Sequence, residues 1–384
     1  MNPLFAGQRT SIFEHMSALA RAHGAVNLGQ GFPDFGWPAD VLDHAAEAVR
    51  NGWNQYPPMR GLPELREAVA AHYRRGQGRD VAADQVVVTS GATEALAASL
   101  IALIEPGDEV VLFQPLYDAY LPLVLRAGGV PRFVRLAPPD WRIGREALAQ
   151  AFTERTRLVL FNNPHNPSSR VFDAGELDAL AEACRAHDSL ILSDEVWEHV
   201  LFDGRRHVPI AALPGMAERT VKVGSAGKIF SLTGWKVGWV VAPPPLAEAV
   251  AKAHQFVTFS TPPNLQSAVA YGLGKPVAEV ERTCAAFAAA RDRLSAGLEA
   301  QGYAALPAEG TYFLSIDLAA SGIAAPDTVF CERAVTEAGV AAIPLSAFYA
   351  EDPATHVVRL CFAKQAETLD AGVDRLGKAR ALFA

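Results

Sequence analysis

A stretch of small and polar residues, GSAGKIFSLTGWKVGW at positions 224–239, contains two lysines, Lys228 and Lys236. Lysine is rare in this chain: only seven of the 34 basic residues are lysine, and none precedes position 222. An amine can lose its proton and attack a carbonyl group, whereas a guanidinium stays charged. The placement of Lys228 therefore favours a lysine used for chemistry that arginine cannot perform.

The segment from about residue 85 to 242 should position these lysines. Nearly continuous apolar strands separated by helices indicate a mostly parallel sheet that is covered on both faces. We therefore predict an α/β fold with a doubly wound, seven-stranded sheet. The seven β-branched runs that predict its strands are at 86–89, 109–113, 132–136, 157–161, 189–194, 220–224 and 237–242.

The C-terminal third has a different pattern. An alanine-rich helix is expected at about 277–301, and it is followed by expected strands at 311–317, 340–344 and 357–363. This mixture predicts a smaller α+β domain, against which the short leading segment should pack. We therefore expect a large domain at 38–275 and a small domain made of 1–37 and 276–384.

Ligands of open α/β sheets bind beyond the carboxyl ends of the strands. The polar residues that end each run are therefore candidate ligand-binding residues. Ser90-Gly91-Ala92-Thr93 follows the run 86–89 and opens a helix. The free N–H groups at a helix N-terminus favour an anion such as a phosphate. Alternatively, Ser90 and Thr93 serve only as helix caps.

Two further strand ends carry groups that could bind a ligand. Asn166 lies in the NNPHNP turn after the run 157–161, and it offers two donors, although asparagine and proline also make plain turns. Asp194 ends the apolar run 189–194. A carboxylate in such a place needs a cation, either the protonated ring nitrogen of a ligand or an arginine in a structural ion pair.

Together these groups match one cofactor. A phosphate cradle, a lone carboxylate, an amide donor and an amine would share one edge of the sheet with the hydroxyl of Ser225 and the second cation, Lys236. Pyridoxal phosphate needs a lysine for covalent attachment and an acid opposite its ring nitrogen. A nicotinamide cofactor would need G-x-G-x-x-G after an early strand, and the sequence has none.

At these residues the sequence resembles the class I, fold type I aminotransferases that use pyridoxal phosphate, and the resemblance covers essentially the whole chain. The motifs N-x-P-H-N-P, S-D-E-V, S-x-G-K-x-F-S-x-x-G-W-K-V-G-W and R-L-C-F-A-K occur in the family's order. The segments that resemble the methionine, glutamine and kynurenine aminotransferase branch are NLGQGFPDF (27–35), NQYPPMRG (54–61), FQPLYDAY (113–120) and VAAIPLSAF (340–348).

The resemblance implies a role for each matching residue. Lys228 would hold the cofactor and later carry a proton, and Asp194 would pair with the pyridinium nitrogen. Asn166 would donate to the ring oxygen O3′, and Tyr117 would lie over the ring face. The residues implied to bind the phosphate are Ser90, Gly91, Ala92, Ser225 and Lys236, together with Tyr56 from the neighbouring subunit of a homodimer.

Three more residues follow from the resemblance. Arg359 would bind the substrate α-carboxylate, and the alternative is a surface arginine on an edge strand. Gly31 would let the substrate approach the backbone, and the alternative is a simple turn glycine. Trp197 departs from the family, which usually has a catalytic tyrosine there whose hydroxyl donates to O3′. Indole can donate one hydrogen bond but cannot ionise.

The implied reaction is ping-pong transamination from an amino acid to a 2-oxo acid. No arginine stands ready for a second carboxylate, which favours methionine, glutamine, kynurenine or aromatic donors over aspartate. The alternatives are a cysteine-S-conjugate β-lyase or another class I branch, such as aspartate or N-succinyl-diaminopimelate aminotransferase. The expected lining of the side-chain pocket is apolar and aromatic: Phe13, Tyr117, Trp197, Phe259 and Phe348.

Composition excludes other classes of protein. The formal net charge of −8 argues against binding to nucleic acid or to an anionic membrane, and no run of about 18 apolar residues could span a bilayer. The N-terminal stretch lacks the features of a secretory signal. The four cysteines have no metal-type spacing, so we expect reduced packing residues, no metal and a cytoplasmic protein. A ligand sensor fused to a DNA-binding module would need a basic segment that the sequence lacks.

Overall fold

The computed structural model describes residues 3–7 and 10–383. Its main feature is a seven-stranded sheet in the order β2-β8-β7-β6-β5-β3-β4. Only β8 runs antiparallel to its neighbours, β2 and β7. The mostly parallel α/β sheet predicted from the sequence is therefore confirmed. Its strands are β2 (Val86–Thr89), β3 (Glu109–Gln114), β4 (Val130–Arg135), β5 (Thr156–Asn162), β6 (Leu190–Asp194), β7 (Thr220–Ser225) and β8 (Gly238–Val241).

Helices cover both faces of this sheet because its strands are apolar on both faces. Val86 and Val88 belong to a core formed with α3, α4 and α11, whereas Val87 belongs to the core that includes α5 and α10. This alternation follows from the two-residue period of a strand. The helices around the sheet are α3 (Ala39–Asn51), α4 (Pro63–Gln77), α5 (Ala92–Leu103), α6 (Tyr120–Arg126), α7 (Arg145–Ala151), α8 (Ala174–Ala186), α10 (Pro244–Val257) and α11 (Pro263–Leu273).

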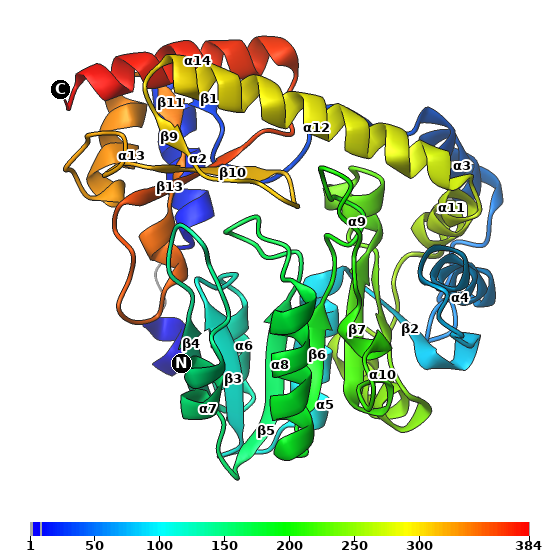
Figure 1. Cartoon of the computed structure of the whole chain (residues 1–384). Helices are drawn as coiled ribbons and strands as arrows, with labels where there is room; N and C mark the ends of the chain where they lie inside the picture. Colours follow the sequence, from blue (N-terminus) through cyan, green and yellow to red (C-terminus); the bar gives the residue numbers. More distant parts are fainter. Residues whose placement is uncertain (1–2, 8–9, 384) are drawn as a thin grey trace.

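Two smaller sheets lie across the top of the large one in Figure 1. A four-stranded antiparallel sheet has the order β12-β13-β10-β9, and β1 pairs in parallel with β11. The strands are β1 (Val26–Asn27), β9 (Ala304–Ala305), β10 (Phe313–Asp317), β11 (Val340–Ala341), β12 (Ile343–Pro344) and β13 (Val357–Cys361). The helices beside them are α2 (Ile12–His23), α12 (Val277–Ala300), α13 (Asp327–Thr336) and α14 (Ala366–Ala381).

The smaller sheets correct one predicted strand. The run 340–344 is not one strand, because the chain leaves β11 after Ala341 and enters a different sheet at Ile343. The pairing of β1 with β11 joins the leading segment to the C-terminal part of the chain. The two helices not yet placed are α1 (Pro3–Ala6) and α9 (Ala226–Ile229).

Two further findings concern the whole described chain. Within residues 3–7 and 10–383, no helix combines the length and the apolar character that crossing a bilayer requires. The four cysteines are unpaired, and Cys184, Cys331 and Cys361 are buried.

Candidate active site

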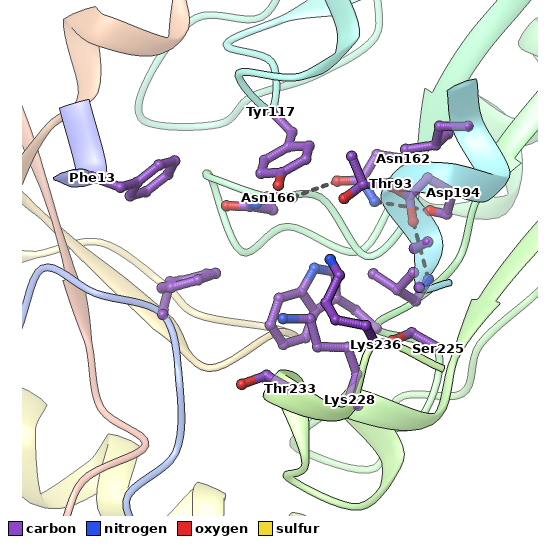
Figure 2. Close-up of a pocket in the computed structure, with 18 of the residues that line it drawn as sticks. Phe13, Thr93, Tyr117, Asn162, Asn166, Asp194, Ser225, Lys228, Thr233 and Lys236 are labelled. Carbon is purple, nitrogen blue, oxygen red and sulfur yellow. Dashed lines mark hydrogen bonds between the residues drawn. The ribbon is translucent and has the colours of Figure 1, made fainter. Parts of the chain in front are cut away.

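A cavity of about 300 Å³ lies between the carboxyl ends of β5, β6 and β7 and the four-stranded sheet, which contributes Phe313 and Arg359. We call the part of the molecule formed by the two smaller sheets the small-sheet side. Lys228 and Lys236 lie on one side of it, and Tyr117, Asn166 and Asp194 lie on the other (Figure 2). Most of the residues predicted from the sequence line it together: Phe13, Gly31, Gly91, Ala92, Tyr117, Asn166, Asp194, Trp197, Ser225, Lys228, Lys236 and Arg359.

Four predicted residues lie outside this cavity. The hydroxyl of Ser90 lies 3.2 Å from that of Thr261, and its backbone N–H donates to the carboxylate of Glu94. Tyr56 is 82% exposed, and its ring meets the ring of Phe259 edge-on at 5.6 Å. Phe348 is buried against Phe13 at 5.6 Å, outside the lining of the cavity.

Lys228 reaches the cavity from α9, a single helical turn that follows β7. Its ammonium nitrogen lies 3.1 Å from the hydroxyl of Tyr312 and 4.6 Å from the ring centre of Trp197. Burial lowers the pKa of Lys228 to about 8, Asp194 opposes this, and Lys236 and Arg359 lower it further. About a tenth of this lysine is therefore neutral at pH 7, far more than for an ordinary lysine.

Asp194 is a buried carboxylate at the end of β6. The hydroxyl of Tyr120 donates to its Oδ2 at 2.7 Å, and the backbone N–H of Val196 donates to its Oδ1 at 3.3 Å. Burial raises the pKa of Asp194 to about 6 against the lowering effect of the Tyr120 hydrogen bond. Among the described residues no arginine forms an ion pair with Asp194. The alternative, in which Asp194 pairs with a structural arginine, is therefore wrong.

The N-terminus of α5 and the side chain of Lys236 form a cradle that could hold an anion. Gly91 has φ +80°, and a Cβ there would lie 3.0 Å from Cε and 3.2 Å from Nζ of Lys236. A Cβ at Gly238 would lie 2.7 Å from the carbonyl carbon of Gly91. The buried Ser225 also lines the cavity here. An amine, a hydroxyl and the first helical N–H groups therefore converge, and this set suits a phosphate.

Arg359 is buried at the centre of the four-stranded sheet, where β13 pairs with both β10 and β12. The alternative of a surface arginine on an edge strand is therefore wrong. Its Nη1 donates to Oδ1 of Asn166 at 2.8 Å, and its Nη2 donates to the Gly29 carbonyl at 3.3 Å. Its buried Nε has no partner, and burial lowers the pKa of Arg359 to about 10. A buried guanidinium without a carboxylate partner is suited to bind an anionic ligand.

Sequence reasoning missed Tyr120, which bonds Asp194 in the cavity, and Tyr312, which contacts Lys228 from outside the residues that line the cavity. Tyr312 is buried, its hydroxyl donates to the Gly31 carbonyl at 2.7 Å, and the same oxygen accepts from Lys228. The ring of Trp197 meets the ring of Tyr312 edge-on at 4.4 Å. Lys228 and Tyr312 are 84 positions apart, so their hydrogen bond produces no local motif. No pattern in the sequence therefore indicated this contact.

A second group of charges is buried beside the site, next to Asp194 in the sequence. The Lys222 ammonium lies 2.7 Å from a Glu195 carboxylate oxygen and 2.5 Å from one of Glu198. His207 Nε2 lies 2.6 Å from the same Glu195 oxygen. Glu195, Glu198 and His207 have the spacing of metal ligands, but the ammonium of Lys222 is bonded to both carboxylates. The cluster therefore carries its own cation.

The fold and the site together identify the class of protein. Residues 24–376 match the sequence profile of the family described as aminotransferase class I and II. A solved structure of a methionine aminotransferase from Escherichia coli superimposes with a TM-score of 0.95 at 42% identity, covering 98% of this chain and 99% of that one. The chain belongs to the class I and II aminotransferases and is a transaminase of fold type I; this family depends on pyridoxal phosphate.

The sequence identity between this chain and its relatives differs from one relative to another. The chain is 44% identical to the methionine aminotransferase of Escherichia coli, covering 96% of this chain and 95% of that one. It is equally identical, 44%, to a probable N-succinyldiaminopimelate aminotransferase of Mycobacterium tuberculosis, with the same coverage. It is 37% identical to a kynurenine–oxoglutarate transaminase of Dictyostelium discoideum, covering 96% and 94%.

Proposed function

We propose that this transaminase binds pyridoxal phosphate in the described cavity and transfers the amino group of a neutral, hydrophobic amino acid to a 2-oxo acid. The fit of the residues supports the cofactor. Gly91 leaves the space between α5 and Lys236 that a phosphate needs, and the buried carboxylate of Asp194 lacks a cation that a pyridinium nitrogen would supply. When bound, the cofactor supplies an electron sink for the substrate Cα.

The side chains of the cavity would share the work of binding and proton transfer. Gly91, Ala92, Ser225 and Lys236 would hold the phosphate, with Tyr117 over the ring and Asn166 beside the ring oxygen. Lys228 would form the covalent attachment and, once displaced by substrate, remove the Cα proton as a neutral amine. Its pKa of about 8 allows this role near neutral pH. Arg359 would orient the substrate through its α-carboxylate.

The charge of the cavity lining supports the choice of substrate. Its cationic side chains among the described residues are Lys228, Lys236 and Arg359, and each already has a role. The walls that remain include the aromatic rings of Phe13, Trp197 and Phe313. A second carboxylate on the substrate would therefore lose water contacts without gaining a cation. Methionine and aromatic donors fit this lining better than aspartate.

N-succinyl-diaminopimelate is the second candidate donor, because the relative with that probable activity is as similar as the methionine enzyme. This donor carries carboxylates far from its reacting amine. The cavity described here offers them no free cation. We therefore place it behind methionine.

A panel of donors tests the choice of substrate. The cofactor-loaded protein is mixed with methionine, glutamine, phenylalanine, kynurenine, aspartate or N-succinyl-diaminopimelate, and the cofactor absorbance is followed. We expect methionine and the aromatic donors to react at least about 10-fold more efficiently than the two acidic donors. A reaction with aspartate or N-succinyl-diaminopimelate alone would overturn the substrate class. Pyruvate and ammonia released from a cysteine S-conjugate without any acceptor would indicate the β-lyase.

We also propose a homodimer whose sites are shared. Tyr56 and Trp53 are exposed by 82% and 75% and lie outside the cavity of their own chain, and Phe256 is 85% exposed. Large exposed aromatic residues of this kind favour burial against a second copy, and a two-fold interface would carry Tyr56 toward the partner's phosphate. The division into domains at 38–275 and at 1–37 with 276–384 is part of the same proposal.

A further inference from the structure

Tyr312 joins three parts of the chain through one oxygen atom. It directly precedes β10, its hydroxyl donates to the carbonyl of Gly31 in the leading segment, and it accepts from Lys228 beside the large sheet. Its ring is held by Trp197 at 4.4 Å and by Phe313 at 5.0 Å. The backbone is held as well, because the Phe362 N–H donates to the Tyr312 carbonyl. The phenol is therefore fixed in position.

The direction of these hydrogen bonds determines how Lys228 can be oriented. A phenol has one proton, and Tyr312 gives it to the Gly31 carbonyl at 2.7 Å. Burial raises the pKa of Tyr312 well above its usual value, so this proton stays in place. Toward Lys228 the oxygen can then act only as an acceptor. Lys228 must present an N–H to it.

This requirement has a consequence for a neutral amine. One of its N–H bonds points at Tyr312, so its lone pair must point elsewhere, at roughly the tetrahedral angle from that bond. The second N–H points at the ring of Trp197, whose centre lies 4.6 Å from the amine, because the electron-rich face of the ring accepts a proton and repels a lone pair. The lone pair is then directed toward the remaining open volume, which is the cavity that Lys228 lines. A general base needs this orientation to reach its proton.

We propose that Tyr312 is a positioning residue for the transamination reaction, which holds the displaced Lys228 amine with its lone pair directed at the substrate. The inference rests on the proposed function, because it assigns Lys228 the removal of the Cα proton. It adds a role for a residue that comes from the small-sheet side of the molecule.

The variant Tyr312→Phe tests this role, since it removes the hydroxyl and keeps the ring. The matched control is Tyr303→Phe, which removes a buried hydroxyl that donates to the Leu376 carbonyl at 2.8 Å outside the site. Borohydride labelling at Lys228, on a separate sample of each protein, first establishes that the protein is loaded. The half-reaction is then measured with methionine and with methionine deuterated at Cα.

For Tyr312→Phe we expect the rate of the half-reaction to fall about 10- to 100-fold with little change in the concentration of methionine for half-maximal rate. The deuterium isotope effect rises, because proton removal becomes slower than the other steps. A second readout uses protein freed of cofactor. A hydrogen-bond acceptor favours the ammonium, so its loss moves the pH midpoint for reloading Lys228 downward by roughly half a unit. Tyr303→Phe leaves all of these values unchanged.

If Tyr312→Phe fails to fold, as judged by its thermal melting curve, Tyr312→4-fluorophenylalanine replaces it. This side chain keeps the length of tyrosine and puts fluorine, a weak acceptor that cannot ionise, in the place of the hydroxyl, so the isotope effect and the pH midpoint change in the same directions. A loaded Tyr312 variant with the rate, isotope effect and pH midpoint of the unchanged protein would show that Tyr312 only packs. If the protein without substitutions takes up no pyridoxyl label at Lys228, both this inference and the proposed function are overturned.

Discussion

Gly31 should tolerate no side chain, for a reason that the structure makes specific. Its φ is not positive, so its backbone conformation suits any residue. A Cβ at Gly31, however, would lie 2.6 Å from Cζ of the Phe313 ring, whereas ordinary contact begins at 3.4 Å. In Gly31→Ala the ring must therefore move by about 0.8 Å, the difference between these two distances. Overpacking of this kind costs about 1–3 kcal/mol of unfolding free energy.

The displaced ring should also disturb Arg359. The guanidinium carbon lies 3.8 Å from the Phe313 ring centre, so a shift of the ring displaces the guanidinium and strains its Nη1 hydrogen bond to Asn166. Misplacement of a substrate-orienting group by this distance lowers kcat/KM by about 10- to 100-fold. We expect this loss for Gly31→Ala with methionine as donor.

The assay combines chemical denaturation with steady-state kinetics, and Gly76→Ala is the control. Gly76 lies in α4 with no atom within 4 Å of an added Cβ, so alanine there should stabilise the protein by up to about 1 kcal/mol and leave kcat/KM unchanged. A Gly31→Ala variant that keeps both its stability and its kcat/KM would refute the packing argument.

Two further predictions concern Lys222, which is buried, and Lys228, which is partly buried. Lys222→Met leaves Glu195 and Glu198 without their shared cation, so urea denaturation should show a loss of about 3–5 kcal/mol, whereas the exposed Lys252→Met should change stability by less than about 0.5 kcal/mol; equal stability of the two variants would contradict this. Lys228 has a folded pKa of about 8 against 10.5 when unfolded, so between these values the unfolded chain binds more protons and stability rises with pH. The full penalty is present below about pH 8. Lys228→Met should therefore stabilise the cofactor-free protein at pH 7 by on the order of 2 kcal/mol, since the side chain is only partly buried, with the gain fading toward pH 10.5. A gain that does not depend on pH would rule out a protonation effect.

The large sheet could be predicted because its strands are buried on both faces and so appear as apolar runs. All residues of β2, β3, β7 and β8 are buried. The antiparallel direction of β8 could not be predicted, since an apolar run carries no information about its direction. The strands β1 and β9 have two residues each, which is too short for any periodicity to appear.

The side of the site built by strand ends could also be predicted, because the carboxyl ends of parallel strands meet at one edge. Asp194, Asn166 and Lys228 were placed correctly beside one cavity for this reason. The part contributed by the small-sheet side was predictable only through the resemblance, as with Arg359. Tyr312 lay in a run interpreted as a strand. Its contact with Lys228 depends on how distant parts of the chain pack together, and the spacing of residues in the sequence does not indicate this packing.

The residue that binds pyridoxal phosphate covalently can be identified directly. The protein is incubated with pyridoxal phosphate, reduced with borohydride, digested and mapped by mass spectrometry. We expect one pyridoxyl group on Lys228, and none in a Lys228→Arg variant that still folds. A label on Lys236 or elsewhere, or no label at all, would contradict the assignment of Lys228 as the cofactor-binding lysine.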